Sequence, residues 1–314
     1  MSKPSLSIVI VNWNAGDQLR DCITSIVATS KDELFLSEVF VVDNGSKDDS
    51  LTGIESLGVS INIILNETNL GFAAACNQGA SAASGDYLLF LNPDMRVFEN
   101  SLDIPVAFMQ NPDNSEVGIV GIQLVDEHGI VARSCSRFPI LGMFFAQVLG
   151  INRFSKFRHL AQSMDEWAHD STRYVDQVIG AFFLMRRSTF ISLGGFDQRF
   201  FVYFEEVDLS YRAHQAGLRS IYLAEVQAFH AGCGTSRQVK AHRLFYSLRS
   251  RLMYGFKHFT FVNACILLLL TLFLEPFSRI LFALISRRWC DAHHTLQGYW
   301  MLICDLHNIL RVPK

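Results

Sequence analysis

Three acidic residues stand within four positions directly after an aromatic run. Glu205, Glu206 and Asp208 follow the sequence Phe-Val-Tyr-Phe, and a helical pattern continues from them to Gly217. A carboxylate beside an apolar surface has a raised pKa, which suits a general base. Acids in a first turn also stabilise a helix, but that explanation suits Asp208 better than two adjacent glutamates. The segment therefore predicts a catalytic base, with Glu205 and Glu206 as the candidates.

Two further residues have the chemistry of ligands for a divalent cation. Asp94 closes the sequence FLNPD, in a loop fixed by Pro93, and His230 ends an apolar run. A carboxylate just past a buried strand suits a hard cation that also binds phosphate oxygens, and a neutral imidazole suits manganese. Asn-Pro-Asp is also a common turn, and a single histidine in this position is more often structural. Both interpretations of these residues stay open.

A third set of residues is suited to a nucleotide. Asp43 follows four apolar residues at a predicted strand end, where it can accept a hydrogen bond from the imide N–H of a base. An Asx-turn or a helix N-cap explains Asp43 equally well. Gly71 precedes a small-residue helix whose N-terminus can receive phosphate or ribose oxygens. The sequence lacks both GxGxxG and GxxxxGKS/T, which weakens dinucleotide oxidoreductase and P-loop interpretations.

The elements that must position these residues alternate between strands and helices. The predicted strands are 6–13, 38–46, 59–67 and 86–94, and the predicted helices are 15–29 and 70–84. Such alternation indicates an α/β fold with a mostly parallel sheet, in which ligands bind at the carboxyl ends of the strands. Polar residues gather at those ends: Asn12, Asn14, Asp43, Asn44, Asn66, Asn69, Asn92 and Asp94.

The rest of the chain has a less regular pattern. Residues 117–132 predict a hairpin with its turn at 128–129, and residues 175–197 predict a strand, a short helix and a Gly-Gly turn. Residues 137–173 are rich in Phe and Arg, and we interpret them as an insertion on the acceptor side. Residues 238–314 are expected to be helical.

Composition limits the class of protein. The 314 residues allow one large domain with an appendage, or two domains. A net charge of −3 argues against nucleic acid as the main partner. Seven scattered cysteines without a CxxC pair favour a reduced cytosolic compartment, and the N-terminus has no signal-peptide pattern. Half of the residues are hydrophobic and the mean hydropathy is +0.21, so a membrane-facing segment is expected.

The segment best suited to a membrane lies in the tail. Residues 259–274 form an apolar run that Glu275 and Pro276 interrupt and residues 277–286 resume. Sixteen helical residues span about 24 Å, less than the roughly 30 Å of a bilayer core. A helical hairpin in or against the cytoplasmic leaflet fits better than a span, because basic residues flank it: Arg249, Arg251, Lys257, Arg287 and Arg288. The alternative is a helix pair that packs on the main domain or on a second subunit.

Six segments together resemble glycosyltransferase family 2, most closely its rhamnosyltransferase-like branch. They are SIVIVNWNAGDQLRDCITSI, VFVVDNGSKDDS, NLGFAAACNQGA, DYLLFLNPD, VIGAFFLMRRSTFISLGGFDQRFFVYFEEVDLSYRAHQAG and FHAGCGTS, in the order of the family. The resemblance implies a GT-A fold, a nucleotide-sugar donor, a divalent metal (Mg or Mn) and inversion at the anomeric carbon. It covers most of residues 5–240, so we expect a GT-A domain at 1–240 and a helical, membrane-associated region at 241–314.

The resemblance assigns a role to each polar cluster near the expected donor. It implies that Asp43 binds the nucleobase and that other residues complete the donor pocket: Asn12, Asn69, Gly71 and Asn92. The sequence NPD stands where many family members have Asp-x-Asp, so Asp94 takes the metal position and Asn92 replaces the first acid. This departure weakens the inference of metal dependence. His230 falls at the metal-ligand histidine of the family.

The segment FEEVD falls at the acidic motif that supplies the catalytic base. The family usually has Glu-Asp or Asp-Asp there, and this chain has Glu205–Glu206. The alignment makes Glu206 the base and Glu205 the neighbour that contacts or orients the acceptor. The preceding aromatic rings offer faces against which a sugar can lie.

The expected function is that of an inverting transferase. The expected donor is a dTDP- or UDP-linked sugar, with rhamnose first, and the expected acceptor is a saccharide linked to polyprenyl diphosphate. The enzyme would act at the cytoplasmic face of the cell membrane, in cell-surface polysaccharide synthesis. The alternatives are transfer of another hexose, an inactive scaffold subunit that binds sugar nucleotides, and a membrane-anchored structural protein.

Overall fold

The computed structural model describes residues 3–29, 35–232 and 240–311. Contacts divide the chain into two compact units. The first holds the described residues up to Arg137, Trp167–Gln198 and residues 205–232, and the second holds Phe138–Glu166, Arg199–Phe204 and the helices from Lys240 onward. The domain boundary expected at residue 240 stays a prediction.

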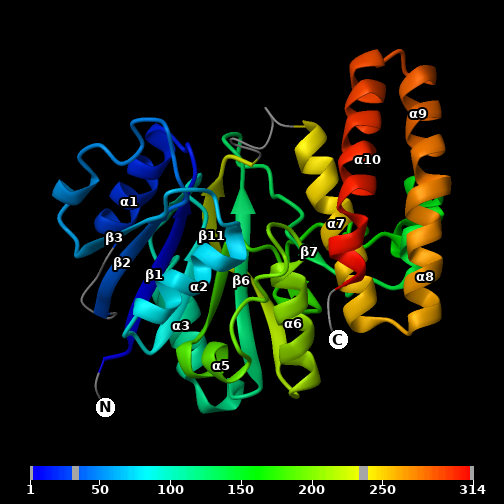
Figure 1. Cartoon of the computed structure of the whole chain (residues 1–314). Coiled ribbons are helices and arrows are strands. Elements are labelled where there is room, and N and C mark those ends of the chain that lie inside the picture. Colours follow the sequence, from blue (N-terminus) through cyan, green and yellow to red (C-terminus); the bar gives the residue numbers. More distant parts are fainter. Residues whose placement is uncertain (1–2, 30–34, 233–239, 312–314) are drawn as a thin grey trace. The chain divides into compact units, whose positions relative to one another are not determined.

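The first unit is built on a sheet whose strands are mostly parallel (Figure 1). Among the described residues the strand order is β3 (Ile61–Leu65), β2 (Phe35–Asp43), β1 (Ser5–Asn12), β4 (Tyr87–Leu91), β10 (Phe182–Arg186), β6 (Val117–Val125), β11 (Arg219–His230) and β5 (Met95–Val97), and β8 (Arg173–Val175) also pairs with β11. Strands β3, β2, β1 and β4 are mutually parallel, as are β6 and β11, whereas β10 is antiparallel to both its neighbours. The predicted α/β fold class is confirmed.

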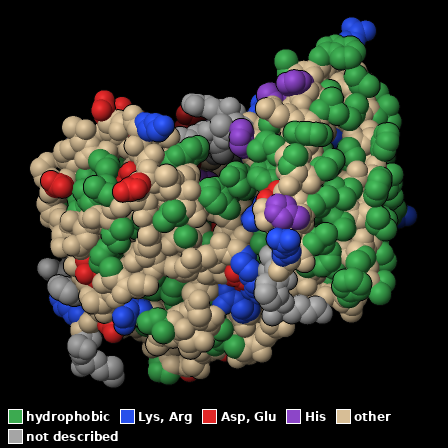
Figure 2. All heavy atoms as spheres, viewed as in Figure 1, with side chains coloured by type: hydrophobic (Ala, Val, Ile, Leu, Met, Phe, Trp, Pro, Cys, Tyr) green, Lys and Arg blue, Asp and Glu red, His purple; other side chains and the backbone are tan. Residues whose placement is uncertain are grey.

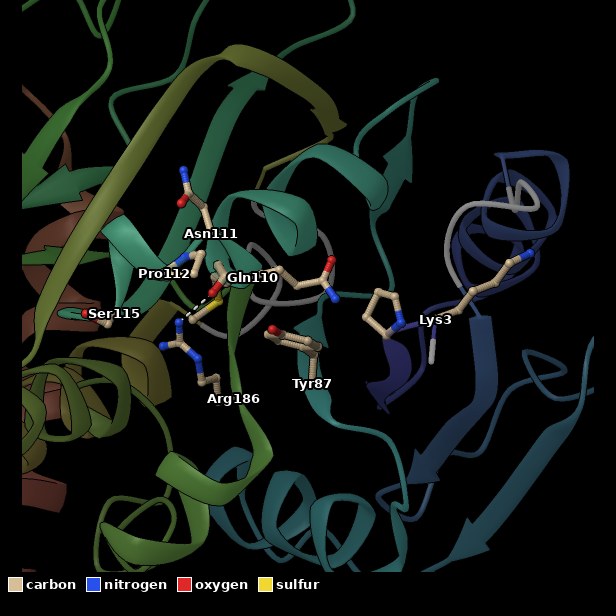
Figure 3. A pocket seen from close by; sticks show the side chains of 9 residues that line it. Lys3, Tyr87, Gln110, Asn111, Pro112, Ser115 and Arg186 are labelled. Atoms are coloured by element: carbon tan, nitrogen blue, oxygen red, sulfur yellow. Dashed lines mark hydrogen bonds between the residues drawn. The ribbon is translucent and has the colours of Figure 1, made fainter. Parts of the chain in front are cut away.

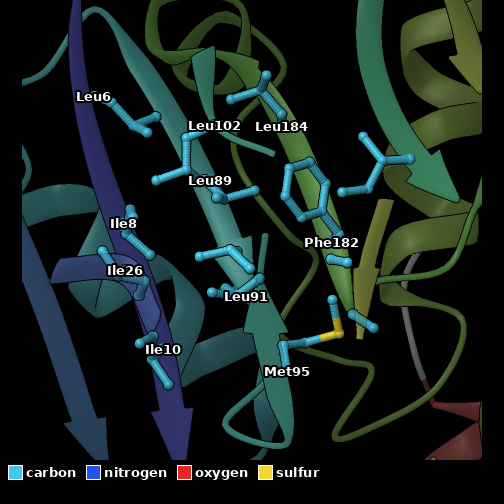
Figure 4. Packing of buried hydrophobic residues seen from close by; sticks show 14 of the residues in the cluster. Leu6, Ile8, Ile10, Ile26, Leu89, Leu91, Met95, Leu102, Phe182 and Leu184 are labelled. Atoms are coloured by element: carbon cyan, nitrogen blue, oxygen red, sulfur yellow. The ribbon is translucent and has the colours of Figure 1, made fainter. Parts of the chain in front are cut away.

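Helices α1 (Asp17–Thr29) and α3 (Asp103–Gln110) cover one face of this sheet. Alternate residues of the central strands point to that face because successive side chains of a strand point in opposite directions. Figure 4 shows part of the resulting core, with Ile8 and Ile10 of β1 beside Leu89 and Leu91 of β4. This apolar layer holds the carboxyl ends of β1, β2 and β4 in fixed positions.

Helices α2 (Phe72–Ala82), α5 (Arg187–Ser192) and α6 (Glu205–Gln215) belong to the opposite layer. Gly79 of α2 lies so close to β1 that a Cβ there would meet Val9 Cγ1 at 2.5 Å. The ring of Phe190 in α5 lies 5.0 Å from that of Phe90 in β4. A separate two-stranded ribbon joins β7 (Cys135–Ser136) to β9 (Gln177–Val178).

The hairpin predicted at 117–132 forms only in part. Asp126 Oδ1 accepts hydrogen bonds from the backbone N–H groups of His128 and Ile130, and Gly129 has a φ of 73°. The returning chain makes one isolated bridge, between Val125 and Val131. The turn is therefore where the sequence predicted it, but β6 pairs mainly with β10 and β11.

The second unit is helical. It contains α4 (Leu141–Val148), short 3-10 helices at Ile151–Arg153 and Ser155–Leu160, α7 (Lys240–His258), α8 (Phe261–Leu269), a π-helical turn η6 (Leu270–Leu274), α9 (Glu275–Ile285) and α10 (Trp289–Leu310). Helix α10 packs along α7 and α9. The helical tail predicted from residue 238 is confirmed from Lys240, since residues 238 and 239 lie outside the described ranges.

The interruption expected at Glu275 and Pro276 is wrong. Residues Phe261–Ile285 form one helical stretch of 25 residues with a mean hydropathy of 2.0, and this length and composition would allow it to cross a membrane. The π-helical turn Leu270–Leu274 carries the backbone past Pro276, which stands in the first turn of α9. The expected run of sixteen residues was therefore too short.

Glu275 interrupts the apolar composition but not the helix, because glutamate is a good helix former and a buried ion cluster neutralises its charge. Its carboxylate pairs with Arg251 of α7 and, at 2.8 Å, with Arg279 one turn later. Arg251 also donates to Thr271 Oγ1 at 2.8 Å. Arg249 is engaged in the same way, because its Nε lies 2.7 Å from Asp305 Oδ2. Arg251 is buried, so the expectation that it faces lipid head groups is wrong.

Candidate active site

Asn12 and Asp43 form a hydrogen-bonded pair at the carboxyl ends of adjacent parallel strands. Asn12 Nδ2 donates to Asp43 Oδ1 and to Ser50 Oγ, each at 2.7 Å, and the N–H of Ser46 donates to Asp43 Oδ2 at 3.0 Å. Asn12 Oδ1 is buried and has no hydrogen-bond partner among the described residues. A buried acceptor of this kind is satisfied when a ligand N–H binds there, as a nucleobase would provide.

Asn44 joins the end of β2 to the loop before α2. Its Nδ2 donates to Asn69 Oδ1 and to the carbonyl of Gly71, each at 3.1 Å, while Asn66 Nδ2 donates to Asn44 Oδ1 at 3.0 Å. Asn69 Oδ1 also accepts from the N–H of Gly71 at 2.9 Å. The side chain of Asn69 thus shapes this loop.

Gly71 sets the direction in which α2 begins. Its φ of 91° lies in a region that favours glycine, and no side chain caps the helix that starts at Phe72. The first N–H groups of α2 therefore remain for an oxygen of a ligand.

Asp94 and His230 lie together because two strands pair beside them. Met95 of β5 is opposite His230 of β11 in the antiparallel register, and the N–H of Ala231 donates to the carbonyl of Asp94 at 3.1 Å. As a result, His230 Nε2 is 3.4 Å from Asp94 Oδ1, and both side chains are largely buried.

This pair fits the needs of a divalent cation. Neighbouring ligands of an octahedral ion with bonds of about 2.1 Å lie about 3 Å apart, close to the observed separation. The described residues contain no group of three or more His, Cys, Asp or Glu side chains that could hold a metal. Mg²⁺ and Mn²⁺ sites at substrate phosphates need only one or two protein ligands, so Asp94 and His230 are enough.

A short segment, 180–181, links the acidic helix to the loop of Asn92 and Asp94. The N–H of Asn92 donates to the carbonyl of Ala181 at 3.0 Å. A Cβ at Gly180 would lie 3.8 Å from Glu206 Cβ and 3.9 Å from Phe72 Cε1. Glu206 therefore lies beside the start of α2 and near the loop that carries Asp94.

Glu205 and Glu206 differ in exposure. Glu205 is 5% exposed, whereas Glu206 is only partly buried. Burial raises the pKa of Glu205 well above its usual range, and the charge of Glu206 raises it further. Burial also raises the pKa of Glu206. Oε2 of each of the two carboxylates is buried and has no hydrogen-bond partner among the described residues. The position of Glu206 beside Gly180 and the start of α2 favours it as the group that meets a substrate, and the fuller burial of Glu205 favours an orienting role.

The third acid of the motif is structural. Asp208 is fully buried, and its Oδ2 lies 2.8 Å from Arg212 Nε, one helical turn later. Arg212 also donates to the carbonyl of Leu193 and, at 2.7 Å, to that of Gly195. This ion pair holds α6 against the Gly-Gly turn.

The aromatic run before the acids serves packing. Phe200 and Phe204 are buried, and the ring of Phe201 stacks on Tyr246 of α7 at 4.5 Å. The interpretation of these rings as a sugar platform is therefore wrong for Phe200 and Phe204, and for Phe201 it stays a prediction. Tyr203 and Phe204 have φ values of 67° and 70°, which are strained for residues with a Cβ. Strain directly before Glu205 is a common feature of functional sites.

A cavity of about 610 Å³ in the first unit contains none of the predicted site residues. Its walls include Tyr87 at the start of β4 and Arg186 at the end of the antiparallel strand β10, so it lies at the sheet edge opposite Asp43 and Asp94 (Figure 3). Arg186 donates to the carbonyls of Met109 and Val117 at 2.5 and 2.6 Å. The arginine thus has a structural role, and this cavity is not the candidate site.

Sequence reasoning missed the residues that support Asp43. Ser46 and Ser50 hold Asn12, and Asp48 Oδ2 accepts from the N–H of Gly16 at 2.9 Å. These contacts tie the loop after β1 to the loop after β2. The dense polar sequence DNGSKDDS at a strand end was the signal that could have identified them.

Replacing Asp43 by Ala is expected to raise the KM for the donor about 10- to 100-fold, because a hydrogen bond to a charged group contributes about 1.5–3 kcal/mol. Asp48→Ala is the matched control, since Asp48 supports the same loop from a more exposed position. Steady-state kinetics at saturating acceptor measures both. Equal KM changes in the two variants would show that Asp43 acts only through the loop.

Comparisons with known proteins identify the family of the chain and its fold. The family model described as "Glycosyl transferase family 2" matches residues 7–208. The O-antigen biosynthesis protein RfbC of Myxococcus xanthus is 31% identical over 72% of this chain, which spans only 17% of that protein. The rhamnosyltransferase WbbL of Escherichia coli is 26% identical over 78% of this chain and 86% of its own length. A Mycobacterium tuberculosis relative, N-acetylglucosaminyl-diphospho-decaprenol L-rhamnosyltransferase, is 26% identical over 72% of this chain and 75% of its own.

Solved structures show the same fold. The mannosyltransferase PcManGT of Pyrobaculum calidifontis, in complex with GDP-Man and Mn²⁺, has a TM-score of 0.59 at 14% identity and covers 97% of this chain and 88% of its own. GalNAc-T7 with UDP, GalNAc and Mn²⁺ has a TM-score of 0.55 at 19% identity over 72% of this chain and 43% of its own. The GT-A fold expected from the sequence is confirmed. The chain is a glycosyltransferase that belongs to glycosyl transferase family 2, in the rhamnosyltransferase-like branch of that family.

Proposed function

We propose that the chain is an inverting, metal-dependent transferase that moves a sugar from a nucleoside-diphosphate donor to a saccharide acceptor. The single observation that carries this proposal is the arrangement around segment 180–181. It lies beside the base candidate Glu206 and is hydrogen-bonded to the loop that carries the metal-ligand candidate Asp94. A single displacement at a sugar phosphate requires a catalytic base and a metal ion. Here the candidate base and the two candidate metal ligands lie on one edge of the sheet.

In this mechanism Glu206 accepts the proton of an acceptor hydroxyl. The oxygen then forms a bond to the anomeric carbon while the bond from that carbon to the diphosphate oxygen breaks, which inverts the configuration. Asp94 and His230 would hold the divalent cation, which supplies charge stabilisation to the departing diphosphate when bound. Asn12 and Asp43 orient the nucleobase of the donor. The N-terminus of α2 receives phosphate or ribose oxygens of the donor.

Rhamnose carried by dTDP or UDP is the first candidate donor. The names of the relatives from E. coli and M. tuberculosis support rhamnosyl transfer, and the second name supports a saccharide acceptor linked to polyprenyl diphosphate. The name of the relative from M. xanthus supports a role in cell-surface polysaccharide synthesis. The alternatives are transfer of another hexose and an inactive sugar-nucleotide-binding scaffold. Donor hydrolysis with and without Mn²⁺ separates the scaffold from both enzymes.

The tail supports attachment to the inner face of the cell membrane. Large apolar side chains recur every four residues along one side of the helix and are 60–74% exposed: Phe273, Phe277, Leu281 and Ile285. Helix α10 adds exposed Trp289, Leu296, Trp300, Ile303 and Leu310. Figure 2 shows hydrophobic side chains gathered over these helices. A surface with one apolar side and an ion cluster on the other suits a helix that lies in one leaflet.

The double substitution Phe277→Glu and Leu281→Glu is expected to move the full-length protein from the membrane fraction to the soluble fraction. Each exposed side chain of this size contributes about 1.5–3 kcal/mol when it enters an apolar phase, and a carboxylate reverses that gain. Ile130→Glu, at an exposed turn of the first unit, is the matched control and should leave the distribution unchanged. Fractionation and donor affinity are measured together, and donor affinity should not change.

Two outcomes would contradict this part of the proposal. Release of the unmodified protein by high salt alone would show that the apolar residues are not in the bilayer. A soluble oligomer that the double substitution converts to a smaller species would show that a second subunit covers this surface instead.

A further inference from the structure

A cavity of about 620 Å³ lies within the second unit, between the helices of the tail. Its walls come from the end of α4, the start of α7, the whole length of α9 and the first turns of α10. Helices α9 and α10 run side by side, antiparallel to each other (Figure 1). The established family membership gives this cavity no role.

The polar wall of the cavity has surplus positive charge. The cations at or behind the wall are Lys240, Arg251, Arg279 and Arg288, and the carboxylates are Glu275 and Asp291. Glu275 is shared by Arg251 and Arg279, while Asp291 is 3.3 Å from Lys240. Arg288 makes no ion pair with any described residue. The wall therefore favours an anion.

A histidine adds an unsatisfied polar atom to this wall. His294 lines the cavity, and its Nδ1 is buried with no hydrogen-bond partner among the described residues. Buried polar atoms are usually hydrogen-bonded, so an orphan beside a cavity indicates a missing partner. Arg288 and His294 together offer donors to an oxygen-rich anion such as a phosphate.

Part of the lining is apolar and reaches the surface. Leu281, Phe282 and Ile285 of α9 line the cavity, and Leu281 and Ile285 also belong to the exposed apolar side of that helix. A ligand that fills the cavity therefore meets both charged groups and an apolar surface that continues to the outside of α9.

We propose that this cavity binds the phosphate head group of an amphiphile, with the alkyl chain lying along Leu281 and Ile285. The charge surplus recognises the phosphate, and Arg288 supplies a donor that no carboxylate in the described ranges occupies. A zwitterionic lipid of the same chain length lacks the net charge, and inorganic phosphate lacks the apolar part. The site is formed entirely by the second unit, and its occupancy needs no sugar donor.

Calorimetric titration of the full-length protein tests this with three soluble probes: dihexanoyl phosphatidic acid, dihexanoyl phosphatidylcholine and inorganic phosphate. The phosphatidic acid is expected to bind at least about tenfold more tightly than either other probe, because only it has both a net negative charge and acyl chains. No binding of phosphatidic acid, or equal affinity for phosphatidylcholine, would overturn the proposal. Equal affinity for inorganic phosphate would show that the cavity binds a free anion and would overturn the proposal that its ligand is an amphiphile.

Two neighbouring arginines give a matched pair of variants. Arg288 lines the cavity and Arg287 does not, and both are exposed at the end of α9. Arg288→Gln should weaken phosphatidic acid binding about tenfold, whereas Arg287→Gln should change it no more than about twofold. Equal weakening by both would show diffuse attraction to the basic helix end, and the cavity would then have no part in binding.

Discussion

Glu206→Gln is expected to lower the rate of sugar transfer by about 10²–10⁴-fold, the usual contribution of a general base. The substitution keeps the shape of the side chain and removes only its ability to accept a proton. Donor affinity should stay within a few fold, because the contacts assigned to the nucleotide come from Asn12, Asp43 and the start of α2. Single-turnover transfer and donor titration measure the two quantities separately.

Glu205→Gln is the matched control for this variant. Glu205 is the more buried of the two, so its role is to orient Glu206, and the loss of rate should be smaller. A buried glutamate with a raised pKa destabilises the folded state as the pH rises through that pKa and the group ionises. Glu205→Gln should therefore raise the Tm at neutral pH. A larger rate loss in Glu205→Gln than in Glu206→Gln would exchange the two roles.

The pH profile provides an independent check on the base. A base works only when deprotonated, so kcat/KM should fall as the pH drops through the pKa of the pair. Burial raises both pKa values, and this acid limb should lie above the range of an exposed glutamate. The pH profile of the residual activity of Glu206→Gln should lack this acid limb or show it at a different pH.

Asp94→Ala and His230→Ala are each expected to lower metal-dependent transfer by about 10²–10³-fold. A bound cation contributes several kcal/mol of charge stabilisation, and each factor of ten in rate corresponds to about 1.4 kcal/mol. Both variants should also weaken binding of Mn²⁺ in the presence of a nucleoside diphosphate, as measured by calorimetry. The distance of 3.4 Å between the two side chains is the reason to expect parallel effects.

His128→Ala is the control for general effects of histidine removal, because His128 is exposed at the turn after β6. It should leave both transfer and metal affinity unchanged. If His230→Ala behaves like His128→Ala, His230 is structural and only Asp94 belongs to the metal site.

Local patterns were enough to predict the sheet and the strand ends. The apolar runs before Asn12, Asp43 and Asn92 fixed three parallel strands, and the polar residues at their ends then had to share one edge. The partnership of Asp94 with His230 was different. It depends on the pairing of β5 with β11, and no spacing in the sequence indicates that register.

The tail shows why other predictions failed. In the sequence Glu275 interrupts an apolar run, and nothing nearby indicates that its charge is paired. Its partner Arg251 lies on a different helix and becomes a neighbour only in the folded unit. The same pairing removed Arg251 from the residues that could meet lipid. Phe200 and Phe204 gave a similar error, because nothing in the local sequence shows that their rings are buried.

The most direct test of the central claim is transfer by the full-length protein with Mn²⁺, a panel of nucleoside-diphosphate sugars and a saccharide linked to polyprenyl diphosphate. Mass spectrometry detects the extended acceptor, and NMR gives its anomeric configuration. We predict one added sugar, with a dTDP- or UDP-linked rhamnose as the best donor, inverted configuration, and loss of the product in Glu206→Gln. Donor binding without transfer or hydrolysis for every sugar would contradict the account and identify the chain as an inactive sugar-nucleotide-binding protein.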